Sequence, residues 1–297
     1  LLQKQGYETN YMREQDLNAN YLPSESIRIP VDKESVLKNK IVDNNLSDEI
    51  VDEIIIKIKG QALYKNRLLM LDIIAENNWE RPIYFTGGSF GDDDYLWMKD
   101  YLQLEGLCYK LVPIKTPIDP SNPYEMGRVN TKKMYSMVKD WDWGTRGNMD
   151  VYFDVESRKN SITYRSNISR LVNQLITENK KVKAEEITDI VIENMPVNIF
   201  GYYTLLETYI ESYYKLDNKE KARILFSEIA DKYKENLFYF STLKDKNTNR
   251  YAEEIYTDIE RYRSLVGVII SYEEGEFLEK QMEDFNSYLE LFIGKEE

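Results

Sequence analysis

The spacing of apolar positions along residues 65–115 predicts an alternation of helices and strands. Residues 68–75 carry apolar side chains at helical spacing, and residues 83–85 form a short strand-like run between an Arg-Pro pair and a Gly-Gly pair. Residues 95–104 continue as a second helix that a glycine ends, and residues 107–114 alternate like a second strand. The order helix, strand, helix, strand is typical of an α/β layer.

Shorter patterns flank this stretch. Residues 26–30 predict a strand that Pro30 closes, residues 32–37 a helical turn, and residues 50–58 a β-branched strand. Residues 116–127 hold three of the eight prolines and predict a loop. A short helix then follows over residues 131–139, and Thr131 is its expected cap.

The remainder of the chain, from residue 162, is helical in pattern and contains an internal repeat. The segment KKVKAEEI at residues 180–187 matches NKEKARIL at residues 218–225, which aligns Ala184 with Ala222. A small residue at this position lets two helices cross closely, as helix-hairpin repeats require. We therefore predict a TPR-like array.

Each repeat segment follows an expected amphipathic helix, over residues 167–177 and 203–214. Two longer helices, over about residues 249–272 and 276–293, are expected to close the bundle. The resulting organisation is a loose lead-in over residues 1–20, an α+β or α/β subdomain over residues 21–155, and an all-α TPR-like subdomain over residues 160–297. The boundary is expected between Asp150 and Ile162.

Four phrases in a fixed order resemble one known family. They are YLPSESIRIPVDKESVL from residue 21, LLMLDIIAENNWERPIYF from residue 68, YLQLEGLCYKLVPIK from residue 101 and GRVNTKKMY from residue 127. The phrases are similar to the soluble C-terminal half of large bacterial membrane proteins that are common in Bacteroidetes. The membrane half of that family resembles protein O-mannosyltransferases of the GT-C glycosyltransferase superfamily.

The resemblance implies where this chain acts. It implies a fragment on the extracytoplasmic (periplasmic) side of the inner membrane, tethered there by a membrane half that the chain lacks. Its implied partners are an acceptor protein or a partner subunit, together with that membrane half. Catalytic carboxylates of such enzymes lie in a membrane-proximal loop, so the resemblance implies that this chain is not catalytic by itself.

Composition excludes several classes of function. The formal net charge of −13 repels the phosphates of nucleic acid and argues against docking on anionic lipid. The chain has no histidine, which excludes His-based triads and His-ligated zinc, and its single cysteine, Cys108, allows no internal disulfide. No apolar run approaches the roughly 18 to 20 residues that span a bilayer. We expect no cofactor.

The sharpest polar motif is the acidic triplet Asp92, Asp93 and Asp94, which follows a glycine-rich turn. Three adjacent carboxylates offer hard oxygen ligands for Mg²⁺, Mn²⁺ or Ca²⁺. The alternative is that the triplet caps the helix expected at residues 95–104 and favours its positive end.

Aromatic residues supply the candidate binding positions. Trp141 and Trp143 flank an aspartate in a loop, with Arg146 nearby, and such rings can stack on a sugar or grip a peptide. Tyr209 and Tyr213 lie on a helix that would line the concave face of a TPR-like array. Packing against the core is the alternative for all four rings.

Three hypotheses for the function remain open at this point. The first is a non-catalytic domain that positions an acceptor protein or a partner subunit. The second is a metal-dependent enzyme that uses the cluster from Asp92 to Asp94. The third is a purely structural TPR-like adaptor.

Overall fold

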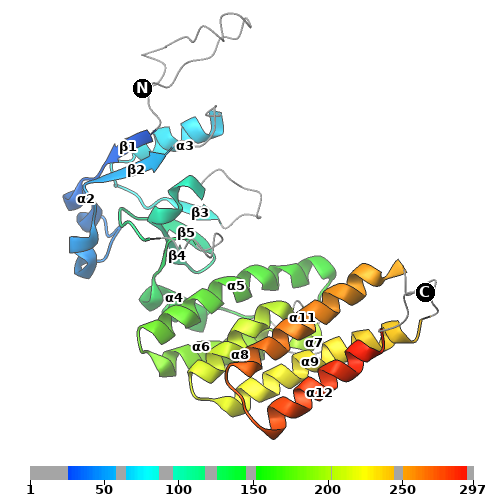
Figure 1. Ribbon diagram of the computed structural model, residues 1–297. Helices are drawn as coiled ribbons and strands as arrows, with labels where there is room; N and C mark the ends of the chain where they lie inside the picture. Colours follow the sequence, from blue (N-terminus) through cyan, green and yellow to red (C-terminus); the bar gives the residue numbers. More distant parts are fainter. Residues whose placement is uncertain are drawn as a thin grey trace, which may run out of the picture. The chain divides into compact units, whose positions relative to one another are not determined.

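The computed structural model divides the chain into two compact units, Leu1–Arg128 and Val129–Glu297 (Figure 1). It describes residues 26–57, 65–86, 96–117, 126–144, 152–201, 203–243 and 250–292. The expected lead-in over residues 1–20 and most of the expected proline-rich loop lie outside these residues. The first unit is mixed α+β and the second is helical.

The first unit begins with a two-stranded antiparallel sheet. Strand β1 (Ser26–Pro30) pairs with β2 (Glu53–Lys57), and Ile54 and Ile56 of β2 are fully buried while Ile55 between them is exposed. This alternation is the period of two that a half-buried strand requires. Both expected strands are confirmed, although β2 starts three residues later than its β-branched run.

Two short helical segments connect these strands. The helix α2 (Lys33–Lys38) confirms the expected helical turn, and the 3₁₀ helix η2 (Asn44–Glu49) follows it. Asp32 caps α2, since its carboxylate accepts from the backbone N–H groups of Glu34 and Ser35.

The helix α3 (Lys65–Glu76) confirms the helix expected over residues 68–75. It ends where Asn78 and Trp79 both adopt positive φ angles, 45° and 61°, which a continuing helix does not allow. Trp79 is buried, and its indole N–H donates to the carbonyl of Pro30 at 3.4 Å. The indole therefore ties the end of α3 to the end of β1.

A second sheet has the order β3-β5-β4-β6. Its strands are β3 (Tyr84–Thr86), β4 (Leu102–Glu105), β5 (Cys108–Leu111) and β6 (Arg128–Val129). The pairs β3–β5 and β4–β5 are antiparallel, so the fold is α+β, and a parallel α/β layer is not what the structure shows.

The prediction of a helix over residues 95–104 is wrong for its last residues, which form a strand. Only a 3₁₀ helix, η3 (Leu96–Tyr101), forms, and the next four residues are strand β4. Leu102 and Leu104 alternate with Gln103 at the period of a strand, and Gly106 at φ 69° allows the tight turn into β5. Cross-strand pairing with β5 overrides the local helical pattern.

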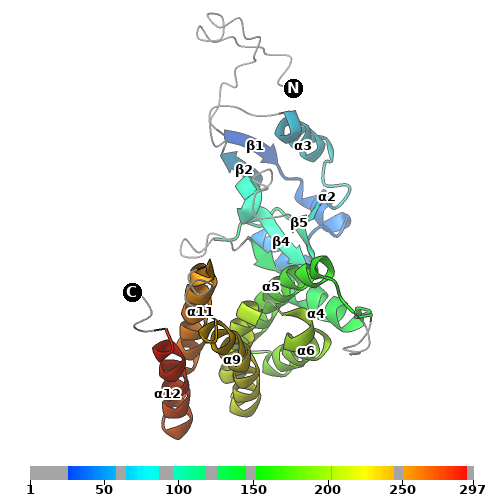
Figure 2. The same cartoon turned by 90° about the vertical axis from the view of Figure 1, so that its right-hand side faces the viewer.

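The second unit contains the remaining helices (Figures 1 and 2). They are α4 (Thr131–Asp140), α5 (Val155–Thr177), α6 (Lys181–Asn194), α7 (Val197–Phe200), the 3₁₀ helix η4 (Tyr203–Leu206), α8 (Glu207–Lys215), α9 (Lys219–Ser241), α11 (Ala252–Ile270) and α12 (Glu276–Glu290). The unit starts at Val129, so α4 groups with the helices, whereas the sequence analysis assigned it to the first subdomain.

The cap of α4 also differs from expectation. Asn130 is the N-cap, and its side-chain oxygen accepts from the backbone N–H of Lys133. Thr131 instead donates its hydroxyl to Glu178 at 2.9 Å. Asparagine is a stronger N-cap than threonine, which explains the shift by one residue.

The internal repeat appears as two equivalent turns, one between α5 and α6 and the other between α8 and α9. Asn179 and Asp217, 38 residues apart, both adopt left-handed φ angles, 57° and 65°. In the first turn the N–H of Lys180 donates to the carbonyl of Leu175, and in the second the N–H of Asn218 donates to the carbonyl of Tyr213. Both turns are therefore Schellman motifs with the same hydrogen-bond pattern.

The aligned alanines occupy equivalent positions after these turns. Ala184 and Ala222 are both fully buried, each in the first turns of the second helix of its hairpin. Their backbone N–H groups donate to the carbonyls of Lys180 and Asn218, the N-cap residues of α6 and α9. The alignment made from the sequence thus corresponds to a shared local geometry.

Replacing either alanine with leucine should overpack its helix crossing. We expect Ala184→Leu and Ala222→Leu each to lower the free energy of unfolding by about 1–3 kcal/mol, since close-packed interiors do not accommodate three extra carbons without strain. Urea denaturation followed by circular dichroism measures this change. Ala252→Leu, at an exposed position on α11, is the matched control and should change stability by less than about 0.5 kcal/mol. If all three substitutions changed the free energy of unfolding equally, Ala184 and Ala222 would not lie at equivalent, close-packed helix crossings.

Candidate binding site

Trp141 and Trp143, which follow the end of α4, form an aromatic cluster with Tyr164 in the middle of α5. The centroids of the Trp141 and Trp143 rings are 5.5 Å apart, and those rings lie 5.3 Å and 6.2 Å from the Tyr164 ring. The planes cross at 53° to 73°, an edge-to-face or tilted arrangement that aromatic pairs favour. All three side chains are half-buried, so the cluster both clamps the loop on α5 and leaves ring surface in solvent.

The backbone of this loop is fixed by a local turn. The carboxylate of Asp142 accepts from the N–H of Gly144 at 2.9 Å, and Gly144 has φ 67°. This is an Asx turn, in which the aspartate side chain replaces a backbone acceptor. It holds Trp141 and Trp143 on either side of an exposed carboxylate.

Several expected positions lie outside the described residues. These are Arg146 and the triplet Asp92, Asp93 and Asp94. The two interpretations of the triplet, metal ligands or helix cap, therefore stay predictions. Among the residues that the structure describes, no group of three or more potential Cys, Asp or Glu ligands is placed to hold a metal ion.

Tyr209 and Tyr213 are buried, so they do not present the partner-binding surface proposed for them. Tyr209 is fully buried, and its hydroxyl donates to the carbonyl of Arg165 at 2.6 Å. Tyr213 is 3% exposed, and its hydroxyl donates to Asp189 at 2.8 Å. Burial raises the pKa of both phenols far above the ordinary value. The packing alternative accounts for these two rings.

Arg165 is a buried cation that the sequence analysis missed. Its guanidinium donates to the carbonyls of Met195 and Gly201, which follow the ends of α6 and α7. The carboxyl ends of helices carry partial negative charge, so they suit a cation. Burial lowers the pKa of Arg165 to about 10. The available signal was an arginine at helical spacing with the apolar residues Ile168 and Val172 of α5.

A second pattern that the sequence analysis missed is a recurring set of tyrosine, carboxylate and cation. The sets are Tyr135–Glu186–Lys139, Tyr213–Asp189–Lys221 and Tyr214–Glu273–Arg223. In each set a phenol hydroxyl donates to a carboxylate that also pairs with Lys or Arg. Each set joins two different hairpins or helices of the second unit.

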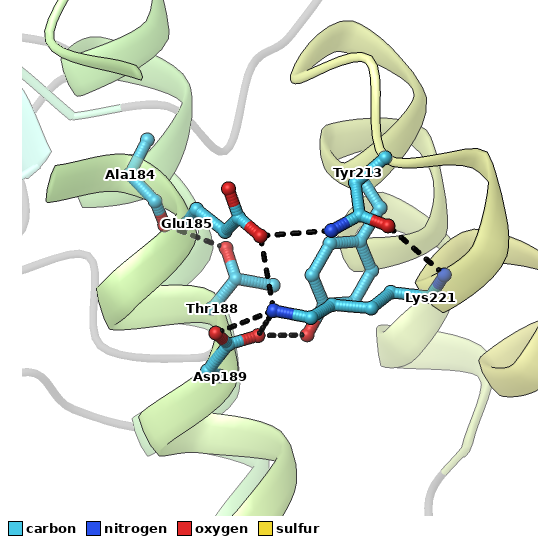
Figure 3. Close-up of polar contacts among 7 residues, drawn as sticks. Ala184, Glu185, Thr188, Asp189, Tyr213 and Lys221 are labelled. Atoms are coloured by element: carbon cyan, nitrogen blue, oxygen red, sulfur yellow. Dashed lines mark hydrogen bonds and ion pairs between the residues drawn. The ribbon is translucent and has the colours of Figure 1, made fainter. Parts of the chain in front are cut away.

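Figure 3 shows the central set between α6 and the α8–α9 turn. The ammonium of Lys221 lies 2.9 Å from Glu185 and 2.7 Å from Asp189, and Asn218 donates to Glu185 at 2.8 Å. The Lys221 ammonium lowers the pKa of the Glu185 carboxyl. These groups satisfy one another, which suits them for fixing the register of the hairpins rather than for proton transfer.

Lowering the pH should reduce the free energy of unfolding of the second unit, because it protonates carboxylates that are paired with Lys or Arg. Lys139, Lys221 and Arg223 hold the pKa values of Glu186, Glu185 and Glu273 below the ordinary value of 4.5. A carboxyl with a depressed folded pKa stabilises the fold above its unfolded pKa and loses that contribution as pH falls through the folded value. We therefore expect the free energy of unfolding to be flat near neutral pH and to decline below pH 4.5.

Urea denaturation at a series of pH values tests this expectation. Glu273→Gln, which removes one of the three carboxyls, should make the decline shallower. Two other carboxyls oppose the trend, because burial raises the pKa of Glu207 and of Asp258. A chain that becomes more stable below pH 4.5 would show that this opposing pair dominates.

Comparison with known proteins gives one match. Residues 1–133 match the family model described as TMEM260-associated domain 2, which fits a TMEM260-related family. No curated protein and no solved structure matches the chain. Within the described ranges, no helix is both long enough and apolar enough to cross a membrane.

Proposed function

We propose that this chain is a non-catalytic domain of a TMEM260-related membrane protein and that it positions an acceptor protein or a partner subunit. The match over residues 1–133 supports the association with such a protein. The two helix hairpins with equivalent turns support a TPR-like array, the kind of scaffold that binds other proteins.

The observation that carries the proposal is the half-exposed cluster of Trp141, Trp143 and Tyr164. Its rings offer a large contact area with few rotatable bonds, which lowers the entropy cost of binding. Asp140 and Asp142 are exposed on either side of Trp141. A ring beside carboxylates suits a glycan hydroxyl or a basic peptide, so we expect an acceptor that is neutral or basic.

The titratable side chains of the second unit favour a binding role over a catalytic one, because most of the carboxylates described above are held in ion pairs. The chain lacks histidine, and the carboxylates of the three tyrosine-containing sets are already paired with Lys or Arg. The reaction would take place in a GT-C-like membrane half, with this domain tethered beside it on the periplasmic face of the inner membrane. Contact with the acceptor would weaken as salt rises, because charge contributes to it.

The test uses the full-length membrane protein with polyprenyl-phosphate sugar as donor. Trp141→Ala combined with Trp143→Ala should raise the apparent KM for a folded protein acceptor about tenfold and leave kcat unchanged, since uniform binding is lost and the reacting groups are untouched. Turnover of a short acceptor peptide should not change.

Tyr152→Ala is the matched control, because this tyrosine is 84% exposed and lies outside the cluster. An unchanged KM for the protein acceptor, or an equal loss of kcat on the short peptide, would contradict a positioning role. Absence of sugar transfer by the full-length protein would remove the glycosyltransferase part of the proposal.

A further inference from the structure

Helices α9 and α11 carry exposed aromatic residues where α9 ends and α11 begins. Phe238 and Tyr239 near the end of α9 are 60% and 58% exposed, and Tyr256 near the start of α11 is 66% exposed. Phe240 and Tyr251 link the two helices there, with ring centroids 5.6 Å apart. We call these five residues the terminal aromatic surface. In Figure 1, the end of α9 and the start of α11 lie together beside the end of α12.

This surface is not explained by packing within the chain. The buried faces of α9 and α11 use other residues, and the Tyr233 and Tyr262 rings stack between the two helices at 5.8 Å. Single exposed apolar residues are ordinary, but large rings gathered at one end of a bundle mark an interaction site. The Tyr239 ring lies 5.6 Å from that of Phe240, so the exposed rings continue the linked pair.

Charge indicates what the surface binds. Glu253 lies one helical turn before Tyr256 on the same helix face. Glu235 lies one turn before Phe238 and Tyr239, but its carboxylate already pairs with Lys232 at 2.9 Å. Glu253 and its neighbour Glu254 are exposed, and neither takes part in an ion pair within the described ranges. Apolar rings rimmed by carboxylates are complementary to large apolar side chains interspersed with Lys or Arg.

We propose that the terminal aromatic surface docks a basic, amphipathic peptide segment of a partner protein. The apolar side chains of that segment pack on Phe238, Tyr239 and Tyr256, and its cations pair with Glu253 and Glu254. The same cations also gain from the faces of the rings. The acidic rim disfavours an anionic membrane surface, which is the other common ligand of exposed aromatic residues. This docking site is separate from the Trp141–Trp143 cluster and does not depend on the proposed function.

The experiment measures binding of a labelled Leu/Lys peptide by fluorescence anisotropy. A peptide of about 18 residues is long enough to form an amphipathic helix on docking. The triple variant Phe238→Ser, Tyr239→Ser and Tyr256→Ser should weaken binding at least about tenfold, because central aromatic contacts dominate such interfaces. The variant Glu253→Gln with Glu254→Gln should weaken it by a smaller factor and flatten its dependence on salt. Tyr152→Ser, at a still more exposed tyrosine elsewhere, should bind as the unsubstituted chain does.

Several outcomes would overturn this inference. One is that the unsubstituted chain does not bind the peptide, and another is that a charge-inverted Leu/Glu peptide binds equally well. If sedimentation shows a dimer that the triple variant dissociates, a second copy of the chain covers the surface instead. If the chain binds anionic vesicles and the triple variant does not, the surface is a lipid site.

Discussion

Arg165→Met should lower the free energy of unfolding by about 3 kcal/mol, the loss expected for two buried hydrogen bonds from a charged donor. Methionine fills similar volume but cannot donate, so the carbonyls of Met195 and Gly201 lose their guanidinium partner inside the helix packing. Arg165 is fully buried, and water cannot easily replace it. Denaturation by urea, followed by far-ultraviolet circular dichroism, gives the value.

Two further variants separate the role of Arg165 from a general effect of removing charge. Arg165→Lys should lose less than Arg165→Met, because an ammonium can still donate to one of the two carbonyls, although it cannot span both as the guanidinium fork does. Arg263→Met, at an exposed arginine of α11 that pairs with Glu260, should change stability by less than about 0.5 kcal/mol. Equal stability of the Arg165→Met chain and the unsubstituted chain would show that the cation costs as much in desolvation as its hydrogen bonds return.

Glu273→Ala should destabilise the second unit by about 3 kcal/mol, because its buried carboxylate accepts several hydrogen bonds and those to charged groups contribute about 1.5–3 kcal/mol each. The Glu273 side chain is 1% exposed, whereas that of Arg223 is 43% exposed and can regain water. The lost contacts are the fork from Arg223, at 2.8 Å and 2.7 Å, and the hydroxyl of Tyr214 at 2.9 Å. Thermal and urea denaturation both report this loss.

The neighbouring carboxylate provides the control for this prediction. Glu274 is exposed, so Glu274→Ala should leave stability within about 0.5 kcal/mol of the unsubstituted chain. Combining Glu273→Ala with Arg223→Met should cost less than the sum of the two single losses, because both substitutions remove the same contact. Additive losses in the double variant would contradict direct coupling of the two side chains.

The strands and helices with strong periodicity were predictable from the sequence. The alternation in β2 reflects the side that faces the core. The helix α3 forms where the spacing predicted it, but of its apolar set Leu71 and Ile74 are buried while Leu69 and Ile73 are exposed. The segment at β4 was not predictable in this way. Its helical spacing competes with a pairing partner, β5, that lies just beyond Gly106, and the gain from cross-strand pairing is not visible in a local window.

In the candidate site, too, features set by local sequence were predictable and features set by distant contacts were not. Trp141 and Trp143 were candidates because they flank an aspartate in a predicted loop, and their role in binding stays a prediction. The burial of Tyr209 and Tyr213 was not predictable, because the sequence does not say which helix covers which face. Arg165 was missed for a related reason, since its partners are main-chain carbonyls, 30 and 36 residues away, that have no sequence signature.

The repeat was found from sequence because it depends on residue types at fixed positions. In the sequence the signal was a small residue at the helix crossing that recurs 38 residues apart, Ala184 with Ala222. The structure adds a second pair at the same spacing, Asn179 with Asp217, in the left-handed conformation. Asparagine and aspartate adopt this conformation more easily than other residues with side chains.

The central claim, that this chain binds and does not catalyse, is tested most directly by assaying the chain alone. It would be incubated with polyprenyl-phosphate sugars and acceptor peptides, with Mn²⁺ and Ca²⁺ present, and product formation would be followed by mass spectrometry. We predict no turnover by the chain and no difference between it and the variant Asp92→Asn with Asp94→Asn. Turnover that disappears in that variant would contradict the claim and establish the acidic triplet as a catalytic metal site.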